Sequence, residues 1–315
     1  MKVKKEYIVL VVLISALTLY LLLHKQDRTQ YELPVLQEVP ASEITRIEIS
    51  KPGGPALSLE RKNDGWILLP EAYQAEVGKM SALLEAIGSL TLTALVSESQ
   101  NFERYGLAKE EKISVKAWAR EKVKRDFEVG KAAPSSQHTF VMLAGDKRVF
   151  QAKENLKPRF DQTLDDLRDK SVFKVEPSAV DGIDLDDGKK ILSLTRKQVP
   201  VEVGAGQKKE SPMGQTQGTW ENTEGKVDEE KVTQLLNALS SLKCRTYLYD
   251  RKKSDLKNPV YTVKVKGMED HSLSLFAKNE KADHPAVSSQ NDSPFFLSEQ
   301  QAKQIMLPFD QIVKP

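Results

Sequence analysis

The acidic run DLDDG, from Asp184 to Gly188, carries the residue types of a calcium loop. In such a loop, oxygen ligands stand at positions 1, 3 and 5, a glycine at position 6 and a glutamate at position 12. Counted from Asp184, Gly188 falls at position 5 and Thr195 at position 12, so the register does not fit. The run is therefore predicted to be a hairpin turn with solvated carboxylates.

Other carboxylates and the histidines raise the question of acid–base catalysis or metal binding. Four aspartates gather near the middle of the chain: Asp161, Asp165, Asp166 and Asp169. A pair of carboxylates can act as general acid and base, but helical spacing favours a solvated helix face. The four histidines, His24, His138, His271 and His284, have no neighbours at metal-ligand spacing. His24 is interpreted as an interfacial residue that ends an apolar stretch, and the others as surface or strand-face residues.

Two tryptophans and one cysteine are further candidates. Trp66 and Trp220 could stack on a sugar or a base. Each follows a strand pattern and precedes a helix pattern, however, which a buried core residue also explains, and burial is favoured. Cys244 could be a nucleophile, but no His and Asn pattern accompanies it, so a small, partly buried residue is favoured.

Known catalytic motifs are missing from the sequence. It contains no G-x-S-x-G nucleophile elbow and no H-E-x-x-H zinc motif. The stretch VGKAAPSS, from Val129 to Ser136, lacks the upstream glycine of a phosphate-binding loop, so it is interpreted as a strand end and turn. We accordingly predict no catalytic, cofactor-binding or metal-ligating residue and no cofactor, and we expect that the protein is not an enzyme.

The composition limits the classes of protein to which the chain can belong. The chain has 315 residues, of which 39% are hydrophobic and 29% charged, which suits about two globular domains. Its formal net charge of +2 comes from the charged residues before residue 7, so the rest is formally neutral. A nucleic-acid partner needs a basic patch, and none is predicted. A single cysteine excludes an intrachain disulfide framework.

The N-terminus has the pattern of a membrane anchor. Tyr7 to Leu23 holds seventeen uncharged, mostly apolar residues, enough for a helix that approaches the ~30 Å hydrocarbon core. The run is longer than that of a cleaved signal peptide, which favours an uncleaved signal anchor. Residues 1–28 are thus predicted to form a cytoplasmic N-terminus and a transmembrane anchor, followed by an extended linker at 29–42. By the positive-inside rule the rest is periplasmic, in a single-pass protein of the bacterial inner membrane. A cytoplasmic bulk is the weaker alternative.

The elements that would position these side chains begin with a meander. Alternation in Ile44 to Ser50, a PGG turn and LSLERK at 57–62 predict a hairpin, to which Trp66 adds a third strand. Glu76 to Leu90 has the apolar spacing of an amphipathic helix. Further short strands and a closing helix over 155–167 complete this part of the chain.

The second half of the chain repeats that order. LSLTRK at 192–197 matches LSLERK at five of six positions. The helix pattern KMSALLEAIGSL at 79–90 returns as KVTQLLNALSSL at 231–242. An ordered series of such matches predicts a tandem duplication of about 130 residues per copy.

The predicted fold is therefore α+β, with two similar repeats after the transmembrane helix. Repeat 1 covers 43–174 and repeat 2 covers 175–315, each a mostly antiparallel sheet with a packed amphipathic helix. A segment at 198–219, rich in Gly, Gln and Ser, is inserted in the second repeat. It is interpreted as a mobile surface loop, with a partner-binding loop as the alternative.

Several short motifs carry a family resemblance. They are the N-terminal anchor, the strand pair ending in a Trp, the Leu-Leu helix, YGL at Tyr105 to Leu107 and VGK at Val129 to Lys131. In this order they resemble a bacterial family of unknown function, whose members are often associated with ABC transport systems of the gliding-motility type. The second half departs from the pattern, with Asp255-Leu256 in place of YGL. The resemblance implies an extracytoplasmic accessory or scaffold and supplies no catalytic residues.

We expect a non-enzymatic binding or scaffold module, an accessory of an envelope or ABC-transporter-type complex. Its partners would be the inner membrane, through Tyr7 to Leu23, and an envelope protein such as an ABC-transporter component. The alternative is an envelope ligand-binding protein or a polymer-modifying enzyme with an unrecognised site. A deep pocket with convergent polar groups and carboxylates of shifted pKa would favour that alternative.

Overall fold

The computed structural model describes residues 5–23, 31–63, 65–198 and 218–314. Helix α1 (Lys5–Leu23) lies where the sequence predicts the membrane anchor, and its side chains are described from residue 9 to residue 20. No helix in the described part of the chain is long and apolar enough to span a membrane, so the predicted transmembrane anchor is not confirmed.

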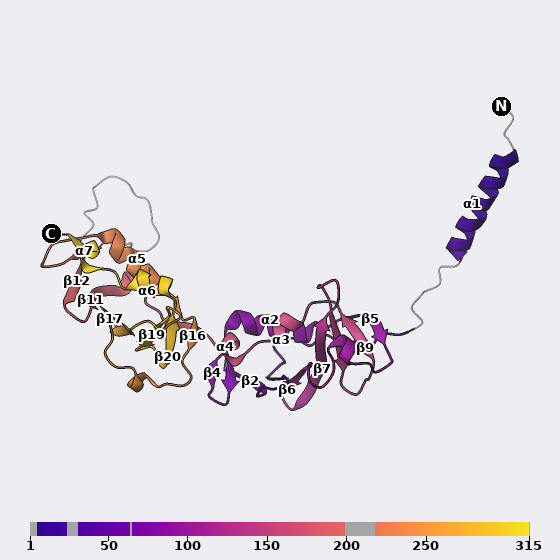
Figure 1. Cartoon of the computed structure of the whole chain (residues 1–315), viewed down its shortest axis with the longest axis horizontal. Helices are drawn as coiled ribbons and strands as arrows, with labels where there is room; N and C mark the ends of the chain where they lie inside the picture. The colour runs from indigo at the N-terminus through magenta and orange to yellow at the C-terminus, as the bar shows by residue number, and fades with distance from the viewer. Residues whose placement is uncertain (1–4, 24–30, 64, 199–217, 315) are drawn as a thin grey trace, which may run out of the picture. The chain divides into compact units, whose positions relative to one another are not determined.

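The chain packs into two units, each with its own sheet (Figure 1). The first unit consists of residues 1–72 and 77–162, and the second of residues 73–76 and 163–315. The boundary expected from the sequence, between residues 174 and 175, lies further along the chain. The difference arises because Phe173 belongs to the buried apolar cluster of the second unit, where β10 (Ser171–Phe173) pairs with β15 (Leu242–Lys243).

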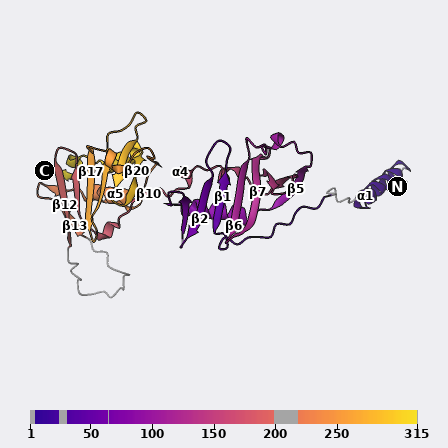
Figure 2. The same cartoon turned by 90° about the horizontal axis from the view of Figure 1, so that it is seen from below.

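The first unit is built on an antiparallel sheet (Figure 2). Its strands follow the order β3-β2-β1-β6-β7-β8-β9-β5. Their bounds are β1 (Arg46–Ser50), β2 (Leu57–Lys62), β3 (Gly65–Leu69), β5 (Leu92–Ser97), β6 (Ile113–Ala119), β7 (Lys122–Ala132), β8 (Thr139–Leu143) and β9 (Val149–Ala152). In β1 and β2 alternate residues are buried, as the period of two predicts. Ile47 pairs with Ala117 and Ile49 with Val115, and all four are fully buried.

Helix α2 (Val77–Gly88) supplies apolar side chains to this core, among them the fully buried Ile87. Beside it lies α3 (Lys157–Phe160), whose Phe160 packs edge-on against Phe127 of β7 with ring centroids 5.7 Å apart. Arg125 satisfies the last carbonyls of α2, donating to Ile87 O at 3.1 Å and Gly88 O at 3.2 Å. A cation at this end also complements the helix dipole. The predicted helix over 76–90 is confirmed.

The YGL and VGK motifs meet in the first unit. The 3-10 helix η1 (Glu103–Tyr105) ends at Gly106, whose φ of +63° lies in the left-handed region. Gly130 of β7 approaches this turn so closely that a Cβ atom there would collide with the carbonyl oxygen of Tyr105. Glycine is therefore required at both positions, which gives the two motifs a shared structural basis.

Replacing Gly130 by alanine is expected to destabilise the first unit by about 2–3 kcal/mol, as in other overpacked sites. The added methyl group meets the backbone oxygens of Tyr105 and Phe140, neither of which is a flexible side-chain end. Urea unfolding followed by tryptophan fluorescence measures the loss. Gly54→Ala is the matched control, because a Cβ there meets nothing within 4 Å. Equal losses in the two variants would contradict the packing role of Gly130.

The second unit is also built on an antiparallel sheet, with the order β13-β12-β11-β17-β18-β19-β20-β16. This matches the order in the first sheet, apart from the two-residue edge strand β4 (Tyr73–Gln74) that the first sheet has in addition. The bounds are β11 (Val180–Asp186), β12 (Ile191–Gln198), β13 (Gly218–Glu221), β16 (Thr246–Tyr247), β17 (Tyr261–Gly267), β18 (His271–Leu275), β19 (His284–Ser288) and β20 (Asn291–Leu297). A separate two-stranded sheet joins β14 (Lys226–Val227) and β21 (Val313–Lys314). The remaining elements are short: strand β4 (Tyr73–Gln74) and the 3-10 helices η2 (Pro177–Ala179) and η3 (Lys253–Asp255).

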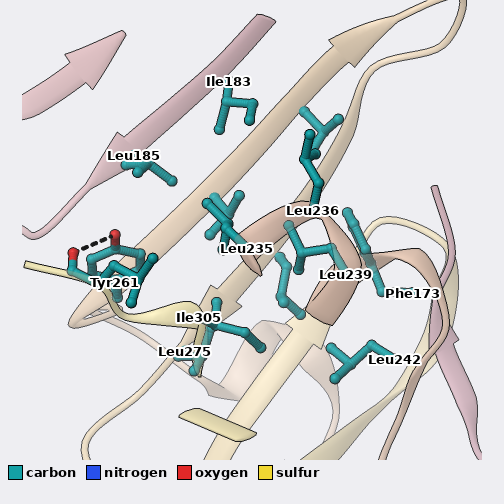
Figure 3. Close-up of a cluster of buried hydrophobic side chains, with 14 of the residues drawn as sticks. Phe173, Ile183, Leu185, Leu235, Leu236, Leu239, Leu242, Tyr261, Leu275 and Ile305 are labelled. Atoms are coloured by element: carbon teal, nitrogen blue, oxygen red, sulfur yellow. Dashed lines mark hydrogen bonds between the residues drawn. The ribbon is translucent and has the colours of Figure 1, made fainter. Parts of the chain in front are cut away.

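The described part of the second unit has four α-helices: α4 (Leu164–Leu167), α5 (Glu229–Ser240), α6 (Glu299–Ile305) and α7 (Phe309–Ile312). Figure 3 shows Leu235 and Leu239 of α5 among side chains from the sheet and from α6, where Ile305 is fully buried. At the edge of this cluster the Tyr261 hydroxyl donates to the Leu307 carbonyl at 3.1 Å (Figure 3). The mostly antiparallel α+β class expected from the sequence is therefore observed.

The closing helix expected over 155–167 is divided in two. After α3, a second short helix, α4 (Leu164–Leu167), begins at Thr163. The Thr163 hydroxyl accepts the N–H of Asp166, and the Asp166 carboxylate accepts the N–H of Thr163. This capping box starts a new helix where the pattern predicted continuation. Almost all of the inserted loop expected at 198–219 lies outside the described residues.

Candidate functional site

Both tryptophans interpreted as core residues are buried. Trp66 on β3 is 7% exposed and Trp220 on β13 is 6% exposed. An arginine also lies over each ring: Arg61 at 5.2 Å and Arg196 at 5.7 Å from the ring centroids. The prediction of burial is confirmed, and neither ring is presented for stacking on a ligand.

Cys244 and His284 are buried, and His271 lies on strand β18. Burial raises the pKa of the Cys244 thiol to about 11, which keeps it protonated near neutral pH. His284 on β19 is buried, with Nδ1 2.9 Å from the Phe276 carbonyl oxygen, and His138 and His271 are half-buried. No group of three or more His, Cys, Asp or Glu side chains in the described ranges could hold a metal ion. His24 lies outside those ranges.

The DLDDG run ends strand β11 and begins the predicted turn to β12, in which Asp187 and Gly188 lie. The Asp187 carboxylate accepts the backbone N–H groups of Lys190 and Lys189, both at 2.9 Å, and these hydrogen bonds lower the pKa of Asp187. Asp184 differs from the prediction of a solvated carboxylate, because it is half-buried in the strand and pairs with Lys266 at 2.6 Å. The VGKAAPSS stretch contains the end of β7 and a turn, as predicted.

A buried arginine lies between two tyrosine rings in the second unit. Arg168, the residue after α4, is 5% exposed. Its guanidinium carbon is 3.6 Å from the ring centroid of Tyr73 and 3.4 Å from that of Tyr247, and its Nη2 donates to Ser293 Oγ at 2.8 Å. The ring centroid of Tyr249 is 6.3 Å from those of both other tyrosines. We call these five residues the arginine cluster.

Backbone pairing brings the first of these tyrosines to Arg168. Asp169 N–H donates to the Gln74 carbonyl at 2.8 Å, and Glu76 N–H donates to the Leu167 carbonyl at 2.8 Å. Ala75 forms an antiparallel bridge with Arg168. The segment 73–76 is thus fixed against the residues that follow α4, which places the Tyr73 ring over the guanidinium.

The charge of Arg168 has little polar compensation. Among the described residues it has no carboxylate partner, and its buried Nη1 has no hydrogen-bond partner. Burial of a charge is costly unless the charge is paired or hydrogen-bonded. The two ring faces offset part of this cost, since a desolvated cation–π contact contributes about 2 kcal/mol. The cluster therefore keeps a positive charge inside the second unit.

Asp165 supports the tyrosine side of the cluster. Its carboxylate accepts hydrogen bonds from the Tyr249 and Thr246 hydroxyls, each at 2.9 Å, and from Lys170. Burial by itself raises the pKa of Asp165, but the hydrogen bonds outweigh it and hold the pKa below the usual aspartate value. The expectation of a solvated acidic helix face is thus wrong for Asp165, which is 25% exposed, because the short helix α4 brings it against β16.

Replacing Asp165 by asparagine is expected to lower the free energy of unfolding by about 2–3 kcal/mol at pH 7, since charge-assisted hydrogen bonds are lost. Because folding lowers the pKa of Asp165, its carboxylate stabilises the fold above the usual aspartate pKa of about 4. This contribution disappears as the pH falls through the lower folded value. Urea unfolding between pH 7 and acid should therefore show the two proteins converging. A gap that stays constant on acidification, or an equal loss in the exposed control Asp187→Asn, would contradict this role.

An open pocket of about 420 Å³ adjoins the arginine cluster. It is lined by Tyr73, Leu248, Tyr249, Arg251, Lys252, Lys253, Ser254, Asp292, Ser293 and Pro294, and we call it the cationic pocket. Three cationic side chains face one carboxylate in this lining. Lys253 is fixed by a 2.7 Å hydrogen bond from Nζ to the Ser288 carbonyl, whereas Arg251 and Lys252 are exposed.

A wider groove of about 820 Å³ lies between α5 and α6. It is lined by Gln234, Asn237, Ala238, Glu299, Gln300, Lys303, Gln304 and Leu307, and we call it the amide groove. Lys303 and Glu299 pair at 3.1 Å, so the lining is neutral. The side-chain amides of Asn237, Gln300 and Gln304 form no hydrogen bonds with the described residues.

The titratable groups of the arginine cluster are either hydrogen-bonded or protonated. A catalyst needs a base or a nucleophile with an open side toward its substrate. Both oxygens of Asp165 already accept hydrogen bonds. Burial raises the pKa of Tyr247 and of Tyr249, so both phenols stay protonated near neutral pH. The linings of the pocket and the groove offer cations, the carboxylate of Asp292, aromatic rings and amides.

The arginine cluster has almost no signature in the sequence. Its members are spread from residue 73 to residue 293, and no motif joins them. The single local signal is the pair of tyrosines in RTYLYD, at 245–250, whose spacing of two places both rings on one side of an extended chain.

Comparison with known proteins yields one match. A family described as a domain of unknown function, DUF4340, matches residues 68–259. The matched part runs from β3 to the residues before β17 and includes Tyr73, Arg168 and the cations of the cationic pocket. No curated protein and no solved structure matches the chain. The match carries no link to a transport system and no indication of a duplicated domain.

Proposed function

The chain belongs to the DUF4340 family, and we propose that it is a non-enzymatic binding module that holds an extended segment of a partner protein in its amide groove. The observation that carries this proposal is the groove between α5 and α6, with its row of side-chain amides that have no partner among the described residues. A side-chain amide offers donors and an acceptor of the same kind as a peptide group.

The lining of the groove supports a peptide as the occupant. Glu299 and Lys303 neutralise each other, so the groove has no excess charge that would select a charged ligand. Leu307 adds an apolar, largely buried contact beside the amides. An uncharged, extended stretch of polypeptide matches such a surface, with backbone hydrogen bonds for affinity and one apolar side chain for register.

The place of the module in the cell is part of the proposal. Its two units would stand in the periplasm, held to the inner membrane by the apolar residues of α1, with the N-terminus in the cytoplasm. The uncharged run from Tyr7 to Leu23 and the lysines before it support this orientation. The partner would belong to an ABC-transporter-type complex of the envelope. The matching strand orders of the two sheets support an origin by tandem duplication.

A photo-crosslinking amino acid placed at Gln304 tests the groove. In membranes that contain the full chain, we expect an adduct with one envelope protein, identified by mass spectrometry. Ala238→Arg, which fills the groove, should abolish the adduct. Thr233→Arg adds the same side chain to an exposed position of α5 that does not line the groove, and it should leave the adduct intact. The proposal fails when no adduct forms at position 304, or when both arginine variants act alike.

Deletion of residues 1–28 tests the anchor separately. We expect the full chain to stay with membranes during alkaline carbonate extraction, because an inserted apolar helix is not released by charge or pH. The shortened chain should appear in the supernatant. Release of the full chain by carbonate would rule out a membrane-spanning anchor and would leave the groove experiment unaffected.

A further inference from the structure

The cationic pocket has features that the packing of the second unit does not require. Arg251 and Lys252 are exposed, and the nearest carboxylate to the Arg251 guanidinium, that of Asp250, is 4.0 Å away and 80% exposed. An exposed pair at this distance contributes little. Arg251 and Lys252 thus line a cavity, and the carboxylates that interact with them, those of Asp250 and Asp255, are themselves exposed to solvent.

The corresponding segment of the first unit shows what the fold alone needs. There, η1 follows Phe102 and precedes Leu107, and both pack in an apolar cluster with Tyr105 and Val149. In the second unit η3 occupies the same place in the order of elements, between the strand after the main helix and the next long strand. Its residues, Lys253, Ser254 and Asp255, are polar and none of them is buried, so this segment does not fill a core.

The buried Arg168 adds positive charge behind the pocket wall. It donates to Ser293 Oγ at 2.8 Å, and Ser293 lines the cationic pocket. A hydroxyl that accepts one hydrogen bond keeps its own proton for a second acceptor. Ser293 can therefore donate into the pocket while Arg168, which has no carboxylate partner among the described residues, polarises it from behind.

We propose that the cationic pocket binds a phosphate group, either free or as the monoester of a small organic molecule. Arg251 and Lys252 supply charge-assisted hydrogen bonds to the phosphate oxygens, and the Ser293 hydroxyl supplies a third donor. The rings of Tyr73 and Tyr249, which also line the pocket, offer apolar faces to the organic part of an ester. The excess of positive charge in the lining matches the dianion of a phosphate monoester.

Calorimetric titration of the purified full chain tests this at low ionic strength, where surface charges are least screened. The probes are inorganic phosphate, phenyl phosphate and sodium acetate. We expect saturable binding of a phosphate probe and none of acetate. Tighter binding of phenyl phosphate than of inorganic phosphate identifies an ester as the ligand, and the reverse identifies free phosphate.

Two double variants separate a site from a general effect of charge. Arg251→Gln with Lys252→Gln should weaken phosphate binding about tenfold or more, since two charge-assisted contacts are lost. Lys278→Gln with Lys281→Gln changes the net charge equally at exposed positions outside the pocket and should shift affinity less than twofold. Ser293→Ala, with its stability checked by thermal unfolding, should weaken binding severalfold.

Three results would overturn the proposal: no saturable heat with either phosphate probe, equal weakening in the two double variants, or unchanged affinity without Arg251 and Lys252. None of these concerns the amide groove, which has no residue in common with the cationic pocket. The proposals of a phosphate site and of a peptide groove are therefore tested independently.

Discussion

Replacing Arg168 by alanine lowers the free energy of unfolding of the second unit by an expected 3–4 kcal/mol, less than the sum of the lost contacts because the cost of burying the charge is removed as well. Two desolvated ring contacts are removed, together with the hydrogen bond to Ser293. The truncation also leaves a cavity between Tyr73 and Tyr247, which the rings fill incompletely. Hydrogen exchange resolved by peptide mass spectrometry measures the loss in the second unit.

Two further variants separate the causes of that loss. Arg251→Ala removes an exposed arginine of the same unit and should change stability by less than about 0.5 kcal/mol. Arg168→Met keeps an unbranched side chain between the rings without the charge, and it should lie between the wild type and the alanine variant. Since buried charges are often less stabilising than apolar groups of the same shape, a methionine variant more stable than the wild type would contradict a stabilising role for the guanidinium.

Leu235→Ala is the second change with a large expected effect, about 3 kcal/mol or more. Leu235 is fully buried in the apolar cluster of Figure 3, with no accessible surface. Removal of its branched end leaves a cavity between α5 and the sheet. Amides of the second unit should lose protection against hydrogen exchange in proportion to the lost stability.

Leu83→Ala is its counterpart in the first unit, where Leu83 of α2 is 1% exposed. That variant should reduce protection among amides of the first unit by a similar amount. Gln234→Ala, at an exposed position of α5, is the control and should alter neither. A loss of protection after Leu235→Ala that is confined to the first unit would contradict the assignment of this leucine to the second core.

The parts of the fold that were predictable rest on local periodicity. The leucines of α2 and α5, the hairpin β1-β2 and the burial of Trp66 and Trp220 all follow from patterns within a few residues. Such patterns are visible in the sequence because burial on one face imposes a period of 3.6 residues on a helix and of 2 residues on a strand. The same reasoning placed the DLDDG turn correctly.

The candidate site was not predictable, because its contacts join distant parts of the chain. Nothing near Arg168 in the sequence indicates that Tyr73 will cover one side of its guanidinium and Tyr247 the other. Asp165 was assigned to solvent because periodicity cannot show that a helix is only one turn long. The capping box at Thr163, which starts a new short helix, corresponds to a Thr-x-x-Asp pattern in the sequence. The predicted anchor at Tyr7 to Leu23 remains a prediction.

The four residues Tyr73–Glu76 have a consequence for how this protein is made and cut. They belong to the second unit, although the chain on both sides of them belongs to the first. During synthesis, Tyr73 leaves the ribosome long before Arg168 and Tyr247. The arginine cluster therefore cannot form until the three separate stretches of the nascent chain that hold these residues have been made. A fragment that begins at residue 163 lacks Tyr73, so one face of the Arg168 guanidinium is uncovered. The second half of the chain is therefore not a self-contained domain, and a fusion protein that includes it needs a residue that replaces Tyr73.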